Sequence, residues 1–157
     1  MIQKLQDENA LPTQLYLSTN AADYQSFLKI NRPRYDDSWE RWNRTLKMLS
    51  TLDTRTVLRI TLIRGYNDDK EMIPAFTSLL RQSNVHFVEI KSYMHIGRST
   101  NRLEHSDMLE MDEIRSFANK LAQENSAFTV MDESDISRIV ILQNKKRFVD
   151  RFIPAYC

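Results

Sequence analysis

Three stretches of this chain alternate apolar with polar residues as β-strands do, and helix-like segments separate them: Gln14–Ser18, Val57–Leu62 and Phe87–Lys91. Strands separated by helices usually pair in parallel, and parallel strands are usually apolar on both faces because helices cover both. Here one face of each strand carries polar or charged side chains. The alternation therefore predicts a parallel sheet with one polar face, which suggests a lumen or cleft that holds a polar ligand.

The rest of the pattern predicts a single α/β domain, with a polar lead-in over 1–12, a barrel half over 13–143 and a basic tail over 144–157. Asp37, with Glu40 three residues later, predicts an N-cap and capping box for the best-signalled helix. This order of elements fits part of a (β/α) barrel or a doubly wound sheet. The expected strands are 13–19, 56–63, 86–92, 128–131 and 138–142, and the expected helices are 23–30, 37–49, one ending near 82, and 112–125.

Composition removes several classes of function. The 157 residues include 22 basic and 21 acidic side chains, so no attraction to nucleic acid or membrane follows from the total charge. The only cysteine is Cys157, which excludes a disulfide framework and a cluster of thiolate ligands within the chain. No run is long and apolar enough to span a bilayer, and residues 1–9 contain no signal-peptide hydrophobic region. We therefore expect a soluble, cytoplasmic protein with no membrane partner.

Candidate functional residues gather where the predicted parallel strands end, because ligands of α/β sheets bind at the carboxyl ends of the strands. Arg59 and Glu89 should share the polar face and pair there, either to satisfy each other or to touch a ligand. Lys91 at a strand end could act as a base, an imine-forming amine or a phosphate anchor, or could simply reach solvent. His95 lies in the next loop, where it could hydrogen-bond a ligand.

Other polar and aromatic residues have simpler interpretations. His86 and His105 have no ligand-spaced partner, which argues against a histidine metal site. Trp39 and Trp42 are expected in the core, and the acids over 132–135 are expected in a turn. Lys145–Arg147 is expected to be a solvated charge run, although it could touch phosphates.

Several motifs together resemble the radical S-adenosylmethionine enzymes of wybutosine synthesis in tRNA, the 4-demethylwyosine synthases. The resemblance runs in order from Leu11 to about Leu142. It is most specific where the lysine strand and its Tyr-Met-His loop follow the Arg-Thr-Leu strand. The motifs are Leu11–Ser18, Asn31–Pro33, Ser38–Arg41, Arg55–Leu62, Gly65–Asn67 and Val88–Gly97.

The resemblance implies the carboxyl-terminal part of a partial (β/α)6 barrel of TIM-like form. It also implies chemistry in which a [4Fe-4S] cluster cleaves S-adenosylmethionine, and the resulting radical helps to condense pyruvate carbons onto N1-methylguanosine of tRNA-Phe. By this resemblance Ser18, Thr61 and Asn67 would lie near S-adenosylmethionine. Lys91, as the catalytic residue, would face the modified base or pyruvate together with His95 and Ser99.

One departure from the family is large, because nothing here matches its Cys-x3-Cys-x2-Cys loop. Iron in a cubane needs thiolate ligands, which Cys157 alone cannot supply. The chain is therefore expected to be a fragment or truncated product of a longer or split enzyme, active only with an amino-terminal cluster-binding polypeptide, or else an inactive RNA- or partner-binding remnant. Exposed strand edges of a half barrel would also favour pairing with a second copy.

Overall fold

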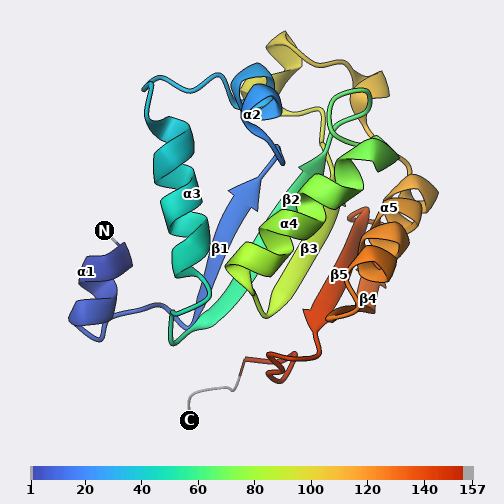
Figure 1. The fold of residues 1–157 in the computed structure, drawn as a ribbon. Helices are drawn as coiled ribbons and strands as arrows, with labels where there is room; N and C mark the ends of the chain where they lie inside the picture. The colour runs from blue at the N-terminus through green and yellow to red at the C-terminus, as the bar shows by residue number, and fades with distance from the viewer. Residues whose placement is uncertain (1, 154–157) are drawn as a thin grey trace.

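A computed structural model describes residues 2–153 as one mixed α/β unit (Figure 1). The strands are β1 (Gln14–Thr19), β2 (Arg55–Leu62), β3 (Phe87–Ser92), β4 (Phe128–Ser134) and β5 (Ile139–Asn144). The helices are α1 (Ile2–Asp7), α2 (Tyr24–Asn31), α3 (Ser38–Met48), α4 (Ile73–Ser83) and α5 (Met111–Glu124), with 3-10 turns η1 (Lys70–Met72), η2 (Gly97–Asn101) and η3 (His105–Asp107).

The five strands form one sheet in the order β1-β2-β3-β5-β4. The first three pair in parallel, as the sequence predicts, and β5 and β4 continue the sheet as an antiparallel hairpin. The sheet is open, with β1 and β4 at its edges. The predicted α/β class is confirmed.

Helices α3, α4 and α5 all lie on one face of the sheet, in front of it in Figure 1. The residues of α5 that the periodicity places inward, Ile114, Phe117, Ala118 and Leu121, are all buried. Phe117 meets Phe76 of α4 edge to face, with 5.7 Å between ring centroids. Burying side chains of this size contributes about 1.5–3 kcal/mol each, so this helical layer holds most of the core.

Local predictions fail where a side chain has an unexpected partner. Asp37 precedes α3 but makes no cap bond; its carboxylate accepts instead from Nε of Arg41 at 2.7 Å, so the predicted capping box is wrong. Trp39 and Trp42 are half-buried rather than core, and their rings stack at 5.3 Å.

The turn predicted for the acids over 132–135 is confirmed only for Asp135, which lies between β4 and β5. Asp132 and Glu133 lie within β4, because this strand runs on to Ser134. Glu133 and Asp135 bind the guanidinium of Arg115 on α5, at 2.9 and 2.5 Å. These side chains therefore tie the hairpin to the helical layer.

Candidate ligand-binding face

The sheet face opposite the helices carries the polar side chains that the alternation predicts. The strand register places Ser18 beside Arg59, Arg59 beside Glu89, and Thr61 beside Lys91. Residues in register on neighbouring strands point to the same side of a sheet. We call this surface the open face; Ser18 on it is exposed, and Thr61 and Lys91 are half-buried. The structure thus brings together three of the six predicted site residues.

An ion pair crosses the middle of the open face. Nε of Arg59 donates to Glu89 at 2.7 Å and its Nη2 donates to the second carboxylate oxygen at 3.3 Å, which confirms the predicted pairing. The ring of Tyr16 lies against the same guanidinium, 4.5 Å from its centroid. The hydrogen bond that Arg59 donates to Glu89 raises the pKa of Arg59, so the guanidinium keeps its charge. A fixed, permanently charged group of this kind can orient an anionic ligand.

A hollow of about 230 Å³ opens on this face at the amino ends of the strands. Its walls include Tyr16, Arg55 and Glu89 from the sheet and Phe152 from the chain end. Arg55 donates to the main-chain oxygens of Asp150, Arg151 and Phe152, which fastens this segment across the lower part of the face. This segment does not cover the upper part of the face, toward the carboxyl ends of β1, β2 and β3.

The side chain of Asn67 points into the protein and stabilises the loop after β2. This side chain is 1% exposed; it accepts from the amide of Ile63 at 2.7 Å and donates to the carbonyls of Asn20 and Thr61, both at 2.8 Å. Gly65 in the same loop has a φ of 71°, a conformation that favours glycine. Both N–H groups of the Asn67 amide are occupied inside the protein. The geometry therefore favours a positioning role for Asn67 over the predicted contact with S-adenosylmethionine.

The loop after β3 holds the other two predicted residues. The Nδ1 atom of His95 lies 3.2 Å from the hydroxyl of Tyr93, and its ring is 6.2 Å from that of His105. The hydroxyl of Ser99 donates to the carbonyl of Ile96 at 2.6 Å, around Gly97 with its φ of 63°. This loop follows the strand of Lys91, so His95 and Ser99 belong to the carboxyl edge rather than to the open face itself.

Arg147 is a structural residue that sequence reasoning missed. It donates to the carbonyls of Leu49, Leu52 and Asn84, which lie at the ends of α3 and α4 and just beyond. Burial lowers its pKa from the usual arginine value, and the helix ends offer it negative dipole charge. The prediction of a solvated charge run over 145–147 is therefore wrong for Arg147, because its guanidinium contacts carbonyl groups at the ends of two helices.

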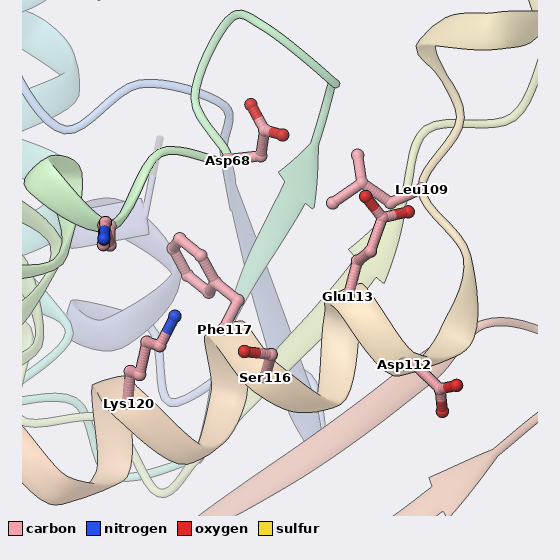
Figure 2. Close-up of a pocket in the computed structure, with 8 residues that line it drawn as sticks. Asp68, Leu109, Asp112, Glu113, Ser116, Phe117 and Lys120 are labelled. Atoms are coloured by element: carbon pink, nitrogen blue, oxygen red, sulfur yellow. The ribbon is translucent and has the colours of Figure 1, made fainter.

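A second hollow of about 320 Å³ lies in the helical layer, between the loop after β2 and α5 (Figure 2). Its carboxylates already have partners: Asp68 accepts from the amide of Gly65, and Glu113 binds Arg64. Asp112 pairs with Arg115 at 2.8 Å. This hollow lies on the other side of the sheet from Lys91, and its acids are used within the fold.

The donor set of the described chain does not fit an iron–sulfur cluster. Within residues 2–153, no three histidine, cysteine, aspartate or glutamate side chains gather as a metal site. Cys157, the chain's one thiol, lies outside the described residues. None of the helices in that range is long and apolar enough to cross a membrane.

Comparison with known proteins shows which proteins this chain is similar to. Residues 82–144 match the family model described as wyosine base formation. The chain is 44% identical over 143 residues to the S-adenosyl-L-methionine-dependent tRNA 4-demethylwyosine synthase of Methanocaldococcus jannaschii, and 36% identical over 141 residues to that of Pyrococcus abyssi. Over most of its own length the chain is similar to tRNA 4-demethylwyosine synthases. The alignments cover 91% and 90% of this chain, which confirms the resemblance drawn from its motifs.

Solved structures of this synthase, named TYW1, share the fold. A structure of TYW1 with a lysine-pyruvate adduct bound superposes with a TM-score of 0.77 at 43% identity, over 90% of this chain and 44% of that one. A crystal structure of archaeal TYW1 gives a TM-score of 0.70 at 39% identity, over 92% and 45%. The chain thus spans less than half the length of these relatives.

Proposed function

We propose that this chain forms the carboxyl-side part of a tRNA 4-demethylwyosine synthase, within a partial (β/α)6 barrel of radical S-adenosylmethionine type. In this proposal a separate amino-terminal portion holds the [4Fe-4S] cluster, which supplies the cleavage of S-adenosylmethionine. The two portions together act on N1-methylguanosine of tRNA-Phe and pyruvate. The observation that carries the proposal is the open face, where Ser18, Arg59, Thr61 and Lys91 lie on adjacent strands in register.

The residues of the open face suit a small charged ligand. The hydroxyls of Ser18 and Thr61 can each donate and accept one hydrogen bond, as a sugar or an amino acid group requires. The ion pair of Arg59 with Glu89 fixes a guanidinium in the middle of the surface. We therefore propose that Ser18 and Thr61 orient S-adenosylmethionine, while Asn67 holds the loop above them from inside.

We propose that Lys91 is the residue of this chain that meets the anionic reactant. Two roles fit a lysine at a strand end: a cation that holds the carboxylate of pyruvate, or a neutral amine that condenses with its ketone. Borohydride reduction in the presence of labelled pyruvate separates them, because only an imine leaves label on the lysine. Label on Lys91 assigns the amine role; turnover that Lys91→Arg preserves, with no label, assigns the cation. If Lys91→Ala keeps full turnover, neither role holds.

The test of the whole proposal is complementation. The chain is mixed with the amino-terminal portion of the Methanocaldococcus jannaschii relative, iron, sulfide and a one-electron reductant (dithionite) are supplied, and release of 5′-deoxyadenosine from S-adenosylmethionine is measured. Cleavage that requires both portions supports the proposal. If the amino-terminal portion is active in its own full-length form but never with this chain, the enzymatic proposal fails.

A second candidate is an inactive module that binds RNA or a partner. Like the first candidate, it is consistent with the lack of a gathered metal-ligand set within residues 2–153. Such a module would bind tRNA yet release no 5′-deoxyadenosine in the complementation assay. The two readouts therefore separate the two candidates.

A further inference from the structure

The α2–α3 hairpin presents aromatic and basic side chains on one exposed surface. Two tyrosines stand out of it, Tyr24 at 43% and Tyr35 at 57% exposure. They line a hollow of about 480 Å³ together with Leu28, Arg32, Pro33 and Asp36. We call these six residues the hairpin hollow. The two rings therefore offer flat apolar surface beside a hollow, on which a planar group can stack.

The aromatic rings of the hairpin are held in place from beneath. Tyr24 leans on Trp39 with 6.2 Å between ring centroids, and Trp39 stacks on Trp42. The guanidinium groups of Arg34 and Arg41 lie 5.7 and 5.6 Å from the ring centroid of Tyr35. A ring that is fixed before a ligand arrives loses little entropy on binding.

The charge of the hairpin differs from that of the rest of the chain. Residues 24–48 contain six basic and three acidic side chains, a net charge of +3, although the whole chain has a formal net charge of only +1. The basic residues are Lys29, Arg32, Arg34, Arg41, Arg44 and Lys47. Arg32 itself takes a left-handed conformation with a φ of 47°, which turns the chain at the end of α2. The local excess of positive charge complements a polyanion.

The hairpin is tied to the carboxyl edge of the sheet. Nε1 of Trp42 donates to the carbonyl of Ser18 at 3.3 Å, and Nη1 of Arg102 donates to the carbonyl of Ile30 at 3.4 Å. The ammonium of Lys29 lies 4.8 Å from the ring centroid of Tyr66, in the loop after β2. These contacts hold the hairpin beside the carboxyl end of β1, and Figure 1 shows α2 beside the upper end of that strand.

We infer that the hairpin hollow binds unpaired nucleotides of an RNA. One base stacks on Tyr35 or Tyr24, and Arg32 and Arg34 hold the neighbouring phosphates. Single-stranded RNA is recognised in this way, with bases on aromatic rings and phosphates on arginines. Asp36 adds a carboxylate that can accept from a base amino group. The inference rests on the proposed function, since it names the surface that receives the tRNA.

The test is a binding titration of the full chain against two RNAs: a hairpin with an unpaired loop, and a blunt duplex of the same stem sequence. We expect the hairpin RNA to bind more tightly. Tyr35→Ala should weaken it about tenfold with an unchanged salt slope, because stacking carries no charge. Arg34→Gln should lower the slope of log K against log salt by about 0.7, as one phosphate contact does on a single strand.

The chain offers a matched control at the amino ends of the parallel strands, away from the hairpin hollow. Phe148 is 71% exposed and follows Lys145 and Lys146, just beyond the end of β5. Phe148→Ala and Lys146→Gln should therefore leave RNA affinity unchanged. Tyr35→Trp should retain binding, and thermal unfolding of each variant checks that the fold survives.

Three outcomes would overturn the inference. Equal binding by Tyr35→Ala, Arg34→Gln and the unmodified chain would place the RNA elsewhere while leaving the synthase proposal intact. Absence of RNA binding, or a preference for the duplex, would reject an unpaired-nucleotide site. A change in sedimentation coefficient upon Tyr35→Ala, without a change in RNA affinity, would show that the hollow joins two copies of the chain. Failure of the proposed function would instead appear as absent 5′-deoxyadenosine.

Discussion

Among single residues, Asn67 provides a sharp test of how the carboxyl edge is held. Asn67→Ala removes one acceptor and two donors, leaving the buried amide of Ile63 and the carbonyl of Thr61 without this partner. Each orphaned buried group costs about 1–3 kcal/mol, so we expect a loss of about 2–4 kcal/mol in the free energy of unfolding. Urea titration measures it. Asn101→Ala on an exposed turn is the control and should change stability by less than about 0.5 kcal/mol.

His86 gives a second residue-level prediction, in the dependence of stability on pH. Its Nδ1 accepts from the amide of Thr56 at 3.0 Å, and the side chain is 7% exposed. Burial, together with the charges of Arg147 and Arg55, lowers its pKa to about 4. A histidine whose folded pKa lies below its unfolded value binds more protons when unfolded. Its stabilising contribution is complete above pH 6.5 and is lost as pH falls toward 4.

From these two pKa values, the loss at pH 5 relative to pH 7 is about 2 kcal/mol. In His86→Asn, whose amide oxygen can still accept from Thr56, the free energy of unfolding should fall less between these pH values. The same substitution at the exposed His105 should leave the wild-type dependence intact. Identical pH profiles for His86→Asn and the unmodified chain would refute the buried neutral imidazole.

Among elements, the ends of α3 and α4 are joined by Arg147. Its planar fork reaches Leu49 and Asn84 at 2.9 Å and Leu52 at 2.8 Å. An ammonium cannot reproduce this arrangement, so Arg147→Lys should cost about 1–3 kcal/mol and speed amide exchange in the last turns of both helices. Lys146→Ala is the neighbouring control, expected to be neutral because Lys146 is exposed and the change lies on the surface. Equal free energies of unfolding for Arg147→Lys and the unmodified chain would show that the guanidinium hydrogen bonds do not stabilise the fold.

The elements also show how far sequence patterns reach. Periodicity locates the inward face of α5 and the alternation of β2. A helix buries every third or fourth residue and a strand every second one, and the buried positions carry apolar residue types. The Asp37–Glu40 signature fails, because a cap requires a bond that Arg41 takes instead. In the sequence, Arg147 resembles part of a solvated charge run. Only the fold shows that carbonyl groups at the ends of α3 and α4 lie beside it. Sequence shows the type of a side chain, whereas its partner depends on packing between segments far apart in the chain.

For the molecule as a whole, the proposed half barrel predicts which edge of the sheet meets the amino-terminal portion. Strand β1 pairs only with β2 among the described strands, and it runs parallel to β2 and β3, as a further barrel strand beside it would. The opposite edge is β4 of the antiparallel hairpin. Unpaired backbone groups of an edge strand are a template for another strand, so β1 is the expected docking edge.

Hydrogen exchange tests this arrangement directly. In the isolated chain, amides of β1 that face away from β2 should exchange freely, whereas β2 and β3 should be protected by pairing on both sides. Adding the amino-terminal portion should slow those β1 amides by about tenfold or more, because a new strand occupies them, and should leave β4 unchanged. Protection gained at β4 but not at β1 would mean that the second portion continues the sheet from the hairpin. The open face would then not form half of a single barrel. Ser18, on the edge strand β1, would lie at the rim of the open face and not inside a barrel.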